Sequence, residues 1–164
     1  MWLRAMQIKI VTVGKLKEKY WQDAVSEYVK RLDPFTRLEI HEIAEERISD
    51  NPGAAEIQQG KVKEGERILK LLSPAYFVIP LVISGKQFSS EELSGILGRL
   101  ALEGKSQLAF IIGGSHGLSE EVVARGNLQL SFSTLTFPHQ LMRVILLEQI
   151  YRSYKILNGE PYHK

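Results

Sequence analysis

The chain has 164 residues and a mass of 18.6 kDa, and its 44% hydrophobic and 24% charged residues are the balance of one folded domain, neither disordered nor fibrous. It has no cysteine, which excludes disulfides, a thiol nucleophile and Cys-ligated metal clusters, and which suits the reducing cytoplasm. A net charge of only +2 is too weak to indicate a polyanionic partner, and no apolar run reaches the roughly 20 residues of a membrane helix.

The first part of the chain predicts a strand, a helix and a second strand before a long loop. Residues 7–13 are β-branched and partly alternating, which favours a strand. Over 15–32 apolar residues recur about every four positions, as in a helix that packs on a sheet, and Asp33-Pro34 ends it. Residues 38–43 predict a short strand, and 44–60, with four acids and little periodicity, predict a loose loop.

The middle of the chain alternates helices with strongly apolar strands. Residues 61–72 predict a helix, and 76–83 predict a strand too continuously apolar to have a wet face. Ser89 and Glu92 form a Ser-x-x-Glu capping box that opens the next helix. A further apolar strand is predicted at 108–112, and such strands are typical of a parallel sheet covered on both faces.

The last third begins with a glycine-rich loop, Gly113-Gly114-Ser115-His116-Gly117. A short helix is predicted from Ser119, a strand at 128–132, and a long helix from Pro138 to Leu157 that Asn158-Gly159 stops. Because strands alternate with helices along the whole chain, the sequence predicts an α/β fold with a mostly parallel sheet.

The long last helix has an unusual pattern. Its apolar side chains spread around most of its circumference, although a sheet covers only one side. A second copy of the chain is the simplest partner for the other side, so we expect a homodimer. The apolar residues are Leu141, Val144, Ile145, Leu147, Ile150, Tyr151, Tyr154 and Leu157.

Two segments are expected to meet at the carboxyl ends of parallel strands, where α/β sheets bind their ligands. The glycine loop at 113–117 lets the backbone approach a ligand closely, although turn geometry alone explains such a loop equally well. Residues 131–137 interleave hydroxyls with apolar side chains, either to cap the last helix or to line a site. Together they predict a ligand site at this edge.

Imidazole groups are the other candidates for chemistry. Pro138 places His139 in the first turn of the last helix, where backbone donors point at a ligand. The tail carries Tyr162 and His163, and it is either idle or able to reach a partner's pocket across a dimer interface. We expect no metal site, because the four histidines have no metal-ligand spacing: His41, His116, His139 and His163.

Four motifs, in order along the chain, resemble the ribosomal RNA large-subunit methyltransferase H (RlmH) family. The similarity runs from about Met6 to Lys164, and His116 is its one departure, at a position where the family also has asparagine. The motifs are Val13-Gly14-Lys15-Leu16-Lys17, Ile111-Ile112-Gly113-Gly114-Ser115-His116-Gly117, Thr136-Phe137-Pro138-His139-Gln140-Leu141-Met142-Arg143 and Gly159-Glu160-Pro161-Tyr162-His163.

The resemblance implies a fold that composition does not indicate. It implies the SPOUT class: an α/β domain with a mostly parallel sheet, helices on both faces, a C-terminal trefoil knot and a homodimer across that knot. Residues 6–164 would form this single domain. Residues 1–5 would be an N-terminal extension outside it.

The resemblance also implies an activity. The enzyme would transfer a methyl group from S-adenosylmethionine to N3 of a pseudouridine in 23S rRNA, on the assembled 70S ribosome in the cytoplasm, without a metal. Carried over onto matching positions, the cofactor-binding residues would be Leu81, Gly113, Phe132, Ser133, Thr134, Leu135, Thr136 and Phe137.

Removal of the N3 proton is the chemical difficulty, because the sulfonium already activates the methyl group. With an imide pKa about two units above neutral, ionisation costs roughly 3 kcal/mol, which a positioned base or cation could supply. The catalytic candidates are His139, Arg143, Tyr162 and His163, with His163 as a possible base and Arg143 as a phosphate or oxyanion contact. Cations available to RNA are Lys15, Lys17, Lys19, Arg152 and Lys155, each equally explained as a solvated side chain.

Two other functions stay open at this point. A non-catalytic nucleotide-binding or assembly module would also use the glycine loop and the apolar last helix. A methyltransferase of the same fold that acts on tRNA is the third possibility, and it predicts transfer to deproteinised tRNA.

Overall fold

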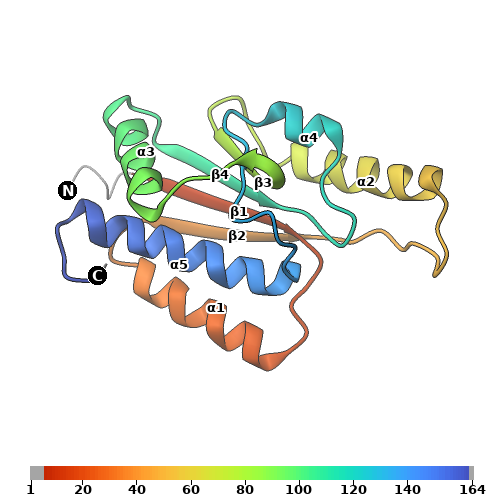
Figure 1. Ribbon diagram of the computed structural model, residues 1–164, viewed down its shortest axis with the longest axis horizontal. Helices are drawn as coiled ribbons and strands as arrows, with labels where there is room; N and C mark the ends of the chain where they lie inside the picture. Colours follow the sequence, from red (N-terminus) through yellow and green to blue (C-terminus); the bar gives the residue numbers. More distant parts are fainter. Residues whose placement is uncertain (1–5, 163–164) are drawn as a thin grey trace.

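A computed structural model describes residues 6–162 of the chain. Figure 1 shows a central sheet with helices on either side. The elements in chain order are β1 (Gln7–Val13), α1 (Lys19–Leu32), β2 (Arg37–Ile43), α2 (Ala54–Leu69), β3 (Phe77–Lys86), α3 (Ser90–Leu102), β4 (Gln107–Ile112), α4 (Glu120–Arg125) and α5 (His139–Leu157).

The four strands form one parallel sheet in the order β2-β1-β4-β3. Side chains of β1 alternate between the two faces of this sheet. Ile8 and Ile10 belong to the core beneath α1, α3 and α5, whereas Val11 and Val13 belong to the core beneath α2 and α4 (Figure 1). The predicted α/β fold with helices on both faces is confirmed, and the trefoil knot stays a prediction.

Helix α5 finds most of its partners within its own chain. It lies over the sheet between α1 and α3, as Figure 1 shows. Leu146, Leu147 and Ile150 are fully buried there. Its apolar circumference therefore does not by itself require a second copy, because two neighbouring helices and the sheet cover most of it. The homodimer stays a prediction that needs other support.

Two helices begin at other residues than the sequence predicts. Helix α1 begins at Lys19 instead of Lys15, because the chain turns at Gly14 (φ +86°) and hydrogen bonds hold the next residues outside the helix. Helix α2 covers 54–69 instead of 61–72, so much of the predicted loose loop is helical. The Glu56 carboxylate accepts hydrogen bonds from the backbone and hydroxyl of Ser49, which ties down the first turn of α2.

The predicted strand at 128–132 is wrong. The sequence also predicts a strand with no solvent-exposed face at 76–83, whereas the second half of β3 is partly exposed. β3 pairs with β4 only over Phe77–Pro80, and beyond this its residues become exposed, with Ile83 54% accessible. The end of β3 curls around the 128–132 segment, so only isolated bridges from Leu130 to Leu81 and Lys86 form. Gly85 makes this crossing possible, because a Cβ at this position would lie only 2.8 Å from the Gln129 backbone.

Local helix signals in the second half are confirmed. Ser89 and Glu92 form the full capping box of α3, and the Ser119 hydroxyl caps α4. Helix α5 stops where predicted, with Asn158 at its C-cap and Gly159 at φ +65°. Pro138 is the N-cap of α5 instead of its first helical residue. Within residues 6–162, no helix is both long enough and apolar enough to cross a membrane.

Candidate ligand pocket

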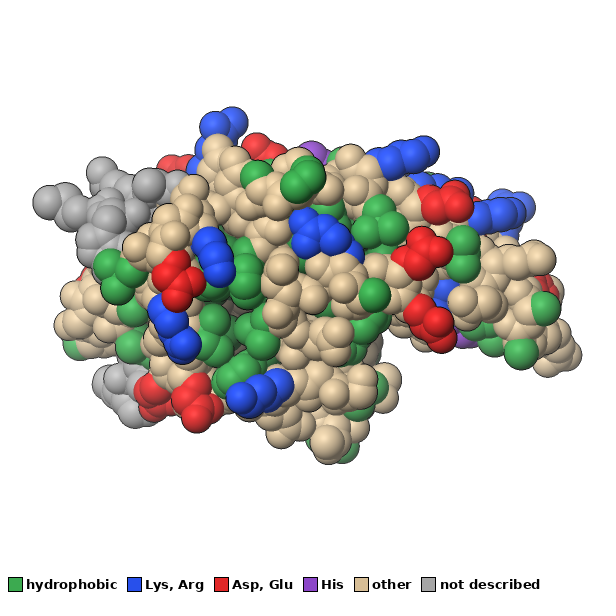
Figure 2. All heavy atoms as spheres, turned by 90° about the horizontal axis from the view of Figure 1, so that it is seen from above, with side chains coloured by type: hydrophobic (Ala, Val, Ile, Leu, Met, Phe, Trp, Pro, Cys, Tyr) green, Lys and Arg blue, Asp and Glu red, His purple; other side chains and the backbone are tan. Residues whose placement is uncertain are grey.

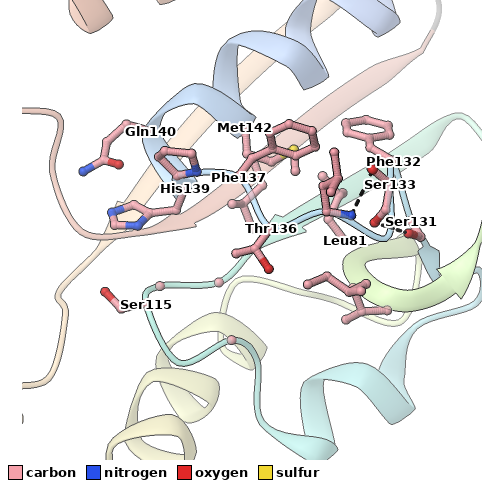
Figure 3. A pocket seen from close by; sticks show the side chains of 18 of the residues that line it. Leu81, Ser115, Ser131, Phe132, Ser133, Thr136, Phe137, His139, Gln140 and Met142 are labelled. Atoms are coloured by element: carbon pink, nitrogen blue, oxygen red, sulfur yellow. Dashed lines mark hydrogen bonds between the residues drawn. The ribbon is translucent and has the colours of Figure 1, made fainter.

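A cavity of about 780 Å³ lies at the carboxyl ends of β3 and β4, within the range of ligand-binding pockets. Its walls come from four parts of the chain: the exposed half of β3, the glycine loop after β4, the segment before α5 and the first turn of α5. Figure 3 shows Leu81, Thr136, Phe137 and His139 around it, with Ser115 on the glycine loop. Seven of the eight predicted cofactor residues line this cavity, and Thr134 lies in the same loop without lining it.

The glycine loop owes its composition to a tight reversal. Gly117 has φ +83° and donates its backbone N–H to the Gly114 carbonyl at 3.1 Å. A Cβ on Gly113 would lie 2.8 Å from the carbonyl carbon of Gly117. The loop therefore folds against its own backbone at Gly113, and this fold places the loop along the cavity wall.

The hydroxyl-rich segment before α5 is held by its own serines. The Ser131 hydroxyl donates to the Ser133 carbonyl at 3.0 Å, and the Ser133 hydroxyl accepts the Leu135 backbone N–H at 3.0 Å (Figure 3). These hydroxyls shape the loop and do not cap α5, whose N-cap makes no side-chain hydrogen bond. Phe132 and Phe137 add apolar surface to the cavity.

The N-terminus of α5 forms the wall that carries His139. The first backbone N–H groups of a helix lack intrahelical partners and carry partial positive charge. Burial lowers the pKa of His139 below its ordinary value of 6.5, and the positive charge of Arg143 lowers it further. His139 is therefore a neutral imidazole at neutral pH, which is the form that can accept a proton.

Arg143 lies one turn further along α5 and points away from the cavity into the protein. It is 3% exposed, and its guanidinium donates to the Glu42 carboxylate at 2.6 Å and to the carbonyls of Gly14 and Val13 at 2.8 and 3.2 Å. Glu42 also accepts the Leu16 backbone N–H at 3.0 Å. Arg143 thus joins α5 to the ends of β1 and β2. Its predicted contact with phosphate or an oxyanion stays a prediction.

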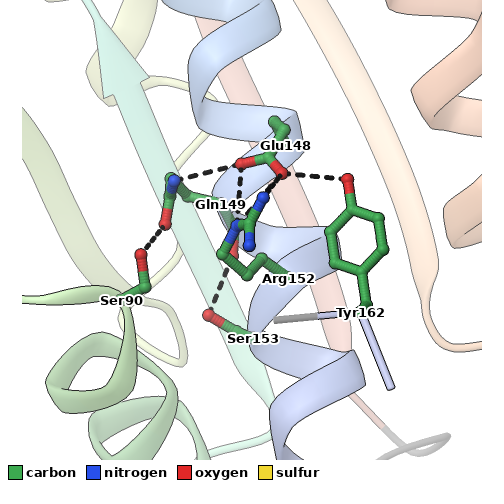
Figure 4. A network of polar contacts seen from close by, with 6 residues as sticks. All are labelled: Ser90, Glu148, Gln149, Arg152, Ser153 and Tyr162. Atoms are coloured by element: carbon green, nitrogen blue, oxygen red, sulfur yellow. Dashed lines mark hydrogen bonds and ion pairs between the residues drawn. The ribbon is translucent and has the colours of Figure 1, made fainter. Parts of the chain in front are cut away.

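Tyr162 lies near the other end of α5, in the polar network of Figure 4. Its hydroxyl donates to Glu148 at 3.1 Å, its ring packs edge-on against Tyr151 and its face lies 4.7 Å from the Arg152 guanidinium carbon. Burial raises the Tyr162 pKa, and the Glu148 carboxylate raises it further. At 1.5 Å per residue, about 14 Å of helix axis separates His139 from Glu148. His163 lies outside the described residues.

Sequence reasoning missed part of the pocket and the partner of Arg143. Val82, Ile83 and Gln140 also line the cavity. Glu42 is 101 positions from Arg143, and no local signal reports a contact at such a separation. Within residues 6–162, no group of three or more His, Asp or Glu side chains is arranged to hold a metal ion.

The fold and the pocket define a class: an α/β protein that binds a ligand at the carboxyl edge of a parallel sheet, against a glycine loop and a helix N-terminus. A family model described as "Predicted SPOUT methyltransferase" matches residues 6–163. This chain belongs to the SPOUT methyltransferase family, whose members generally use S-adenosylmethionine.

Solved structures of similar fold agree with this membership. A probable methyltransferase from Bordetella pertussis Tohama I superposes with a TM-score of 0.58 at 12% identity, over 93% of this chain and 97% of that one. A probable methylase family protein from Haemophilus influenzae Rd KW20 gives a TM-score of 0.51 at 11% identity, over 99% of this chain and 71% of that one. At such low identity these likenesses show the shared fold alone.

Proposed function

We propose that this SPOUT family member transfers a methyl group from S-adenosylmethionine to N3 of a pseudouridine in 23S rRNA of the assembled ribosome. One observation carries the proposal. The cofactor residues expected from the resemblance to the RlmH family lie in three separate parts of the sequence, and seven of the eight line one cavity. The pseudouridine target rests on the four sequence motifs.

The cavity fits S-adenosylmethionine in size and in the chemistry of its walls. Leu81, Phe132 and Phe137 offer apolar surface to an adenine ring, and tight loops offer backbone donors and acceptors to its edges. The N-terminus of α5 offers N–H groups to a carboxylate. When bound, the cofactor supplies a methyl group that its sulfonium has already activated.

The chain must then orient the acceptor base and accept its imide proton. His139 is the described residue best suited to proton transfer, because it lines the cavity and its lowered pKa keeps it neutral. His163, the other candidate base, would come from the tail. Arg143, buried against Glu42, would hold the first turn of α5 and so position His139.

A homodimer would bring the tail to the cavity. Within one chain Tyr162 is bound to Glu148, well away from His139 along α5. Two large apolar side chains at the cavity are also exposed, Ile83 at 54% and Leu135 at 67%. A second copy that covers them could place its own tail at this cavity, so that each site would take its pocket from one protomer and its tail from the other.

The proposal is tested by incubating the protein with radiolabelled S-adenosylmethionine and, in parallel, with 70S ribosomes, isolated subunits and deproteinised tRNA from a strain that lacks the gene. We expect label in 23S rRNA of 70S ribosomes only. Label in tRNA would indicate that the protein methylates tRNA instead of ribosomal RNA. Cofactor binding without label in any RNA would favour the non-catalytic module.

A further inference from the structure

The loop between β1 and α1 (residues 14–18, here the β1–α1 loop) carries two exposed lysines on a backbone fixed from within. Lys15 and Lys17 are exposed, whereas Leu16 between them is half-buried. Within the described part of the chain neither lysine forms an ion pair, in contrast to Lys19, whose ammonium is 2.7 Å from the Asp23 carboxylate. The loop therefore offers two cations that form no ion pair with the described acids, although Glu18 belongs to the same loop.

Several hydrogen bonds hold this loop, and the Arg143–Glu42 pair supplies two of them. Arg143 donates to the Gly14 carbonyl, Glu42 accepts the Leu16 N–H, and the Gln22 side chain donates to the Leu16 carbonyl at 2.8 Å. The Arg143 side chain is 4% exposed and the Glu42 side chain 34%, so solvent screens part of their attraction and the ion pair is a weak source of stability. Its clear effect here is geometric, since it holds the backbone of the loop on both sides of Lys15.

The loop borders the candidate ligand pocket. A Cβ on Gly114, in the pocket wall, would lie 3.2 Å from the Val13 side chain, and the Glu45 carboxylate would lie 3.4 Å from a Cβ on Gly14 and 3.7 Å from one on Gly114. Figure 1 shows the loop passing beside the first turn of α5, which carries His139. The backbone that carries Lys15 and Lys17 therefore lies beside the pocket wall at this side.

An exposed aromatic residue continues the basic loop. Tyr20 in the first turn of α1 is 65% exposed, and its ring lies 5.1 Å from that of Trp21. Its position in the apolar repeat predicts burial, but the first turn of α1 leaves it in solvent. Cations beside an exposed ring suit a nucleic acid, whose phosphates pair with lysine and whose bases stack on aromatic rings. On the face shown in Figure 2, described acids and bases are interspersed.

We propose that the β1–α1 loop binds the RNA backbone next to the methyl-accepting nucleotide through Lys15 and Lys17, and that Glu42 and Arg143 are positioning residues for this loop. The inference rests on the proposed function, because it assumes an RNA acceptor at the pocket. It gives the chain a local phosphate contact, which its net charge of +2 does not supply.

The test compares Lys15→Gln/Lys17→Gln with a control of equal charge change, Lys30→Gln/Lys70→Gln. The control lysines are exposed, Lys30 in the last turn of α1 and Lys70 at the C-cap of α2, and both helix ends lie at the opposite edge of the sheet. Methyl transfer and equilibrium binding to the ribosomal substrate are measured for each at several salt concentrations. We expect the loop variant to raise KM about tenfold with kcat and cofactor affinity unchanged, and to lower the log–log salt slope by about two.

Glu42→Gln tests the positioning role, and it should raise KM for the ribosome while cofactor affinity stays unchanged. If the wild type is active and the loop variant behaves like the control, the inference is overturned and the proposed function is unaffected. A raised KM with an unchanged salt slope would also overturn it, because the contact would not be with phosphates. If the wild type transfers no methyl group, the proposed function fails, and the binding measurements still decide whether the loop holds RNA.

Discussion

Arg143 on α5 and Glu42 at the end of β2 are 101 positions apart, yet the buried guanidinium of Arg143 meets the partly exposed carboxylate of Glu42 at 2.6 Å. This pair joins the helix that begins at the pocket to the carboxyl edge of the sheet, where β1 and β2 end. It also connects the pocket wall that carries His139, one turn earlier on α5, to the basic β1–α1 loop. The arrangement of the pocket therefore depends on a contact outside the pocket itself.

Arg143→Met should destabilise the fold as well as lower activity. The guanidinium is 3% exposed and satisfies two backbone carbonyls as well as Glu42, so its loss leaves buried acceptors unpaired. We expect the free energy of unfolding to fall by about 1–3 kcal/mol, measured by urea denaturation. Arg99→Met, at an exposed site on α3, is the control and should change little. Loss of activity at full stability would instead indicate direct contact with the substrate.

Gly113→Ala should weaken cofactor binding. The added Cβ would approach the Gly117 backbone to 2.8 Å, so the glycine loop would have to move. A shift of this size should lower S-adenosylmethionine affinity about tenfold or more, measured by calorimetry. Gly95→Ala on α3 meets open space and should leave affinity unchanged while stabilising the fold by about 0.5–1 kcal/mol. Equal affinities for the two variants would remove the glycine loop from the cofactor site.

The pH dependence of stability should report His139. Its pKa in the folded protein is lowered by burial and by Arg143, so below pH 6.5 the unfolded chain takes up a proton more readily than the folded one. The contribution of His139 to stability is therefore complete above pH 6.5 and is lost as the pH falls from 6.5 through the folded-state pKa. His139→Gln should flatten the unfolding free energy in that window. An unchanged pH profile would contradict a lowered pKa.

Mixing two variants, assayed at a cofactor concentration too low for Gly113→Ala to be active, tests whether the site is shared between protomers. Gly113→Ala impairs the pocket, and Tyr162→Phe impairs the tail. In a shared site, each mixed dimer has one intact pocket facing one intact tail, so random exchange should restore about a quarter of wild-type activity. No recovery after confirmed exchange would mean that pocket and tail act within one chain.

The sequence predicts best those features whose causes are local. The Ser89–Glu92 capping box, the short helix from Ser119 and the stop at Asn158-Gly159 all depend on neighbouring residues, and all are confirmed. Helix α2 was misplaced because its tertiary packing is invisible locally. A Cβ on Gly65 would lie 2.4 Å from the Ser119 hydroxyl of the α4 cap, so a residue that weakens a helix is used here for close packing.

The candidate site likewise has features that the sequence predicts and features that depend on residues distant in the chain. The residues predicted to bind the cofactor lie around one pocket, because the ends of parallel strands converge and a mostly parallel sheet could be predicted from the alternation of helices and strands. The burial of Arg143 could not be predicted, because Glu42 and the Gly14 and Val13 carbonyls that bind it are distant in sequence. The apolar circumference of α5 was similarly ambiguous, since neighbouring helices and a second copy leave the same pattern.

The identity of the methylated nucleoside tests most directly whether the protein methylates N3 of a pseudouridine in 23S rRNA. Ribosomes from a strain that lacks the gene are treated with the protein and S-adenosylmethionine, and the 23S rRNA is digested to nucleosides for mass spectrometry. We predict one new nucleoside, pseudouridine methylated at N3, which is absent when the target position is uridine. A methyl group on any other nucleoside, or unmodified 23S rRNA despite bound cofactor, would contradict it.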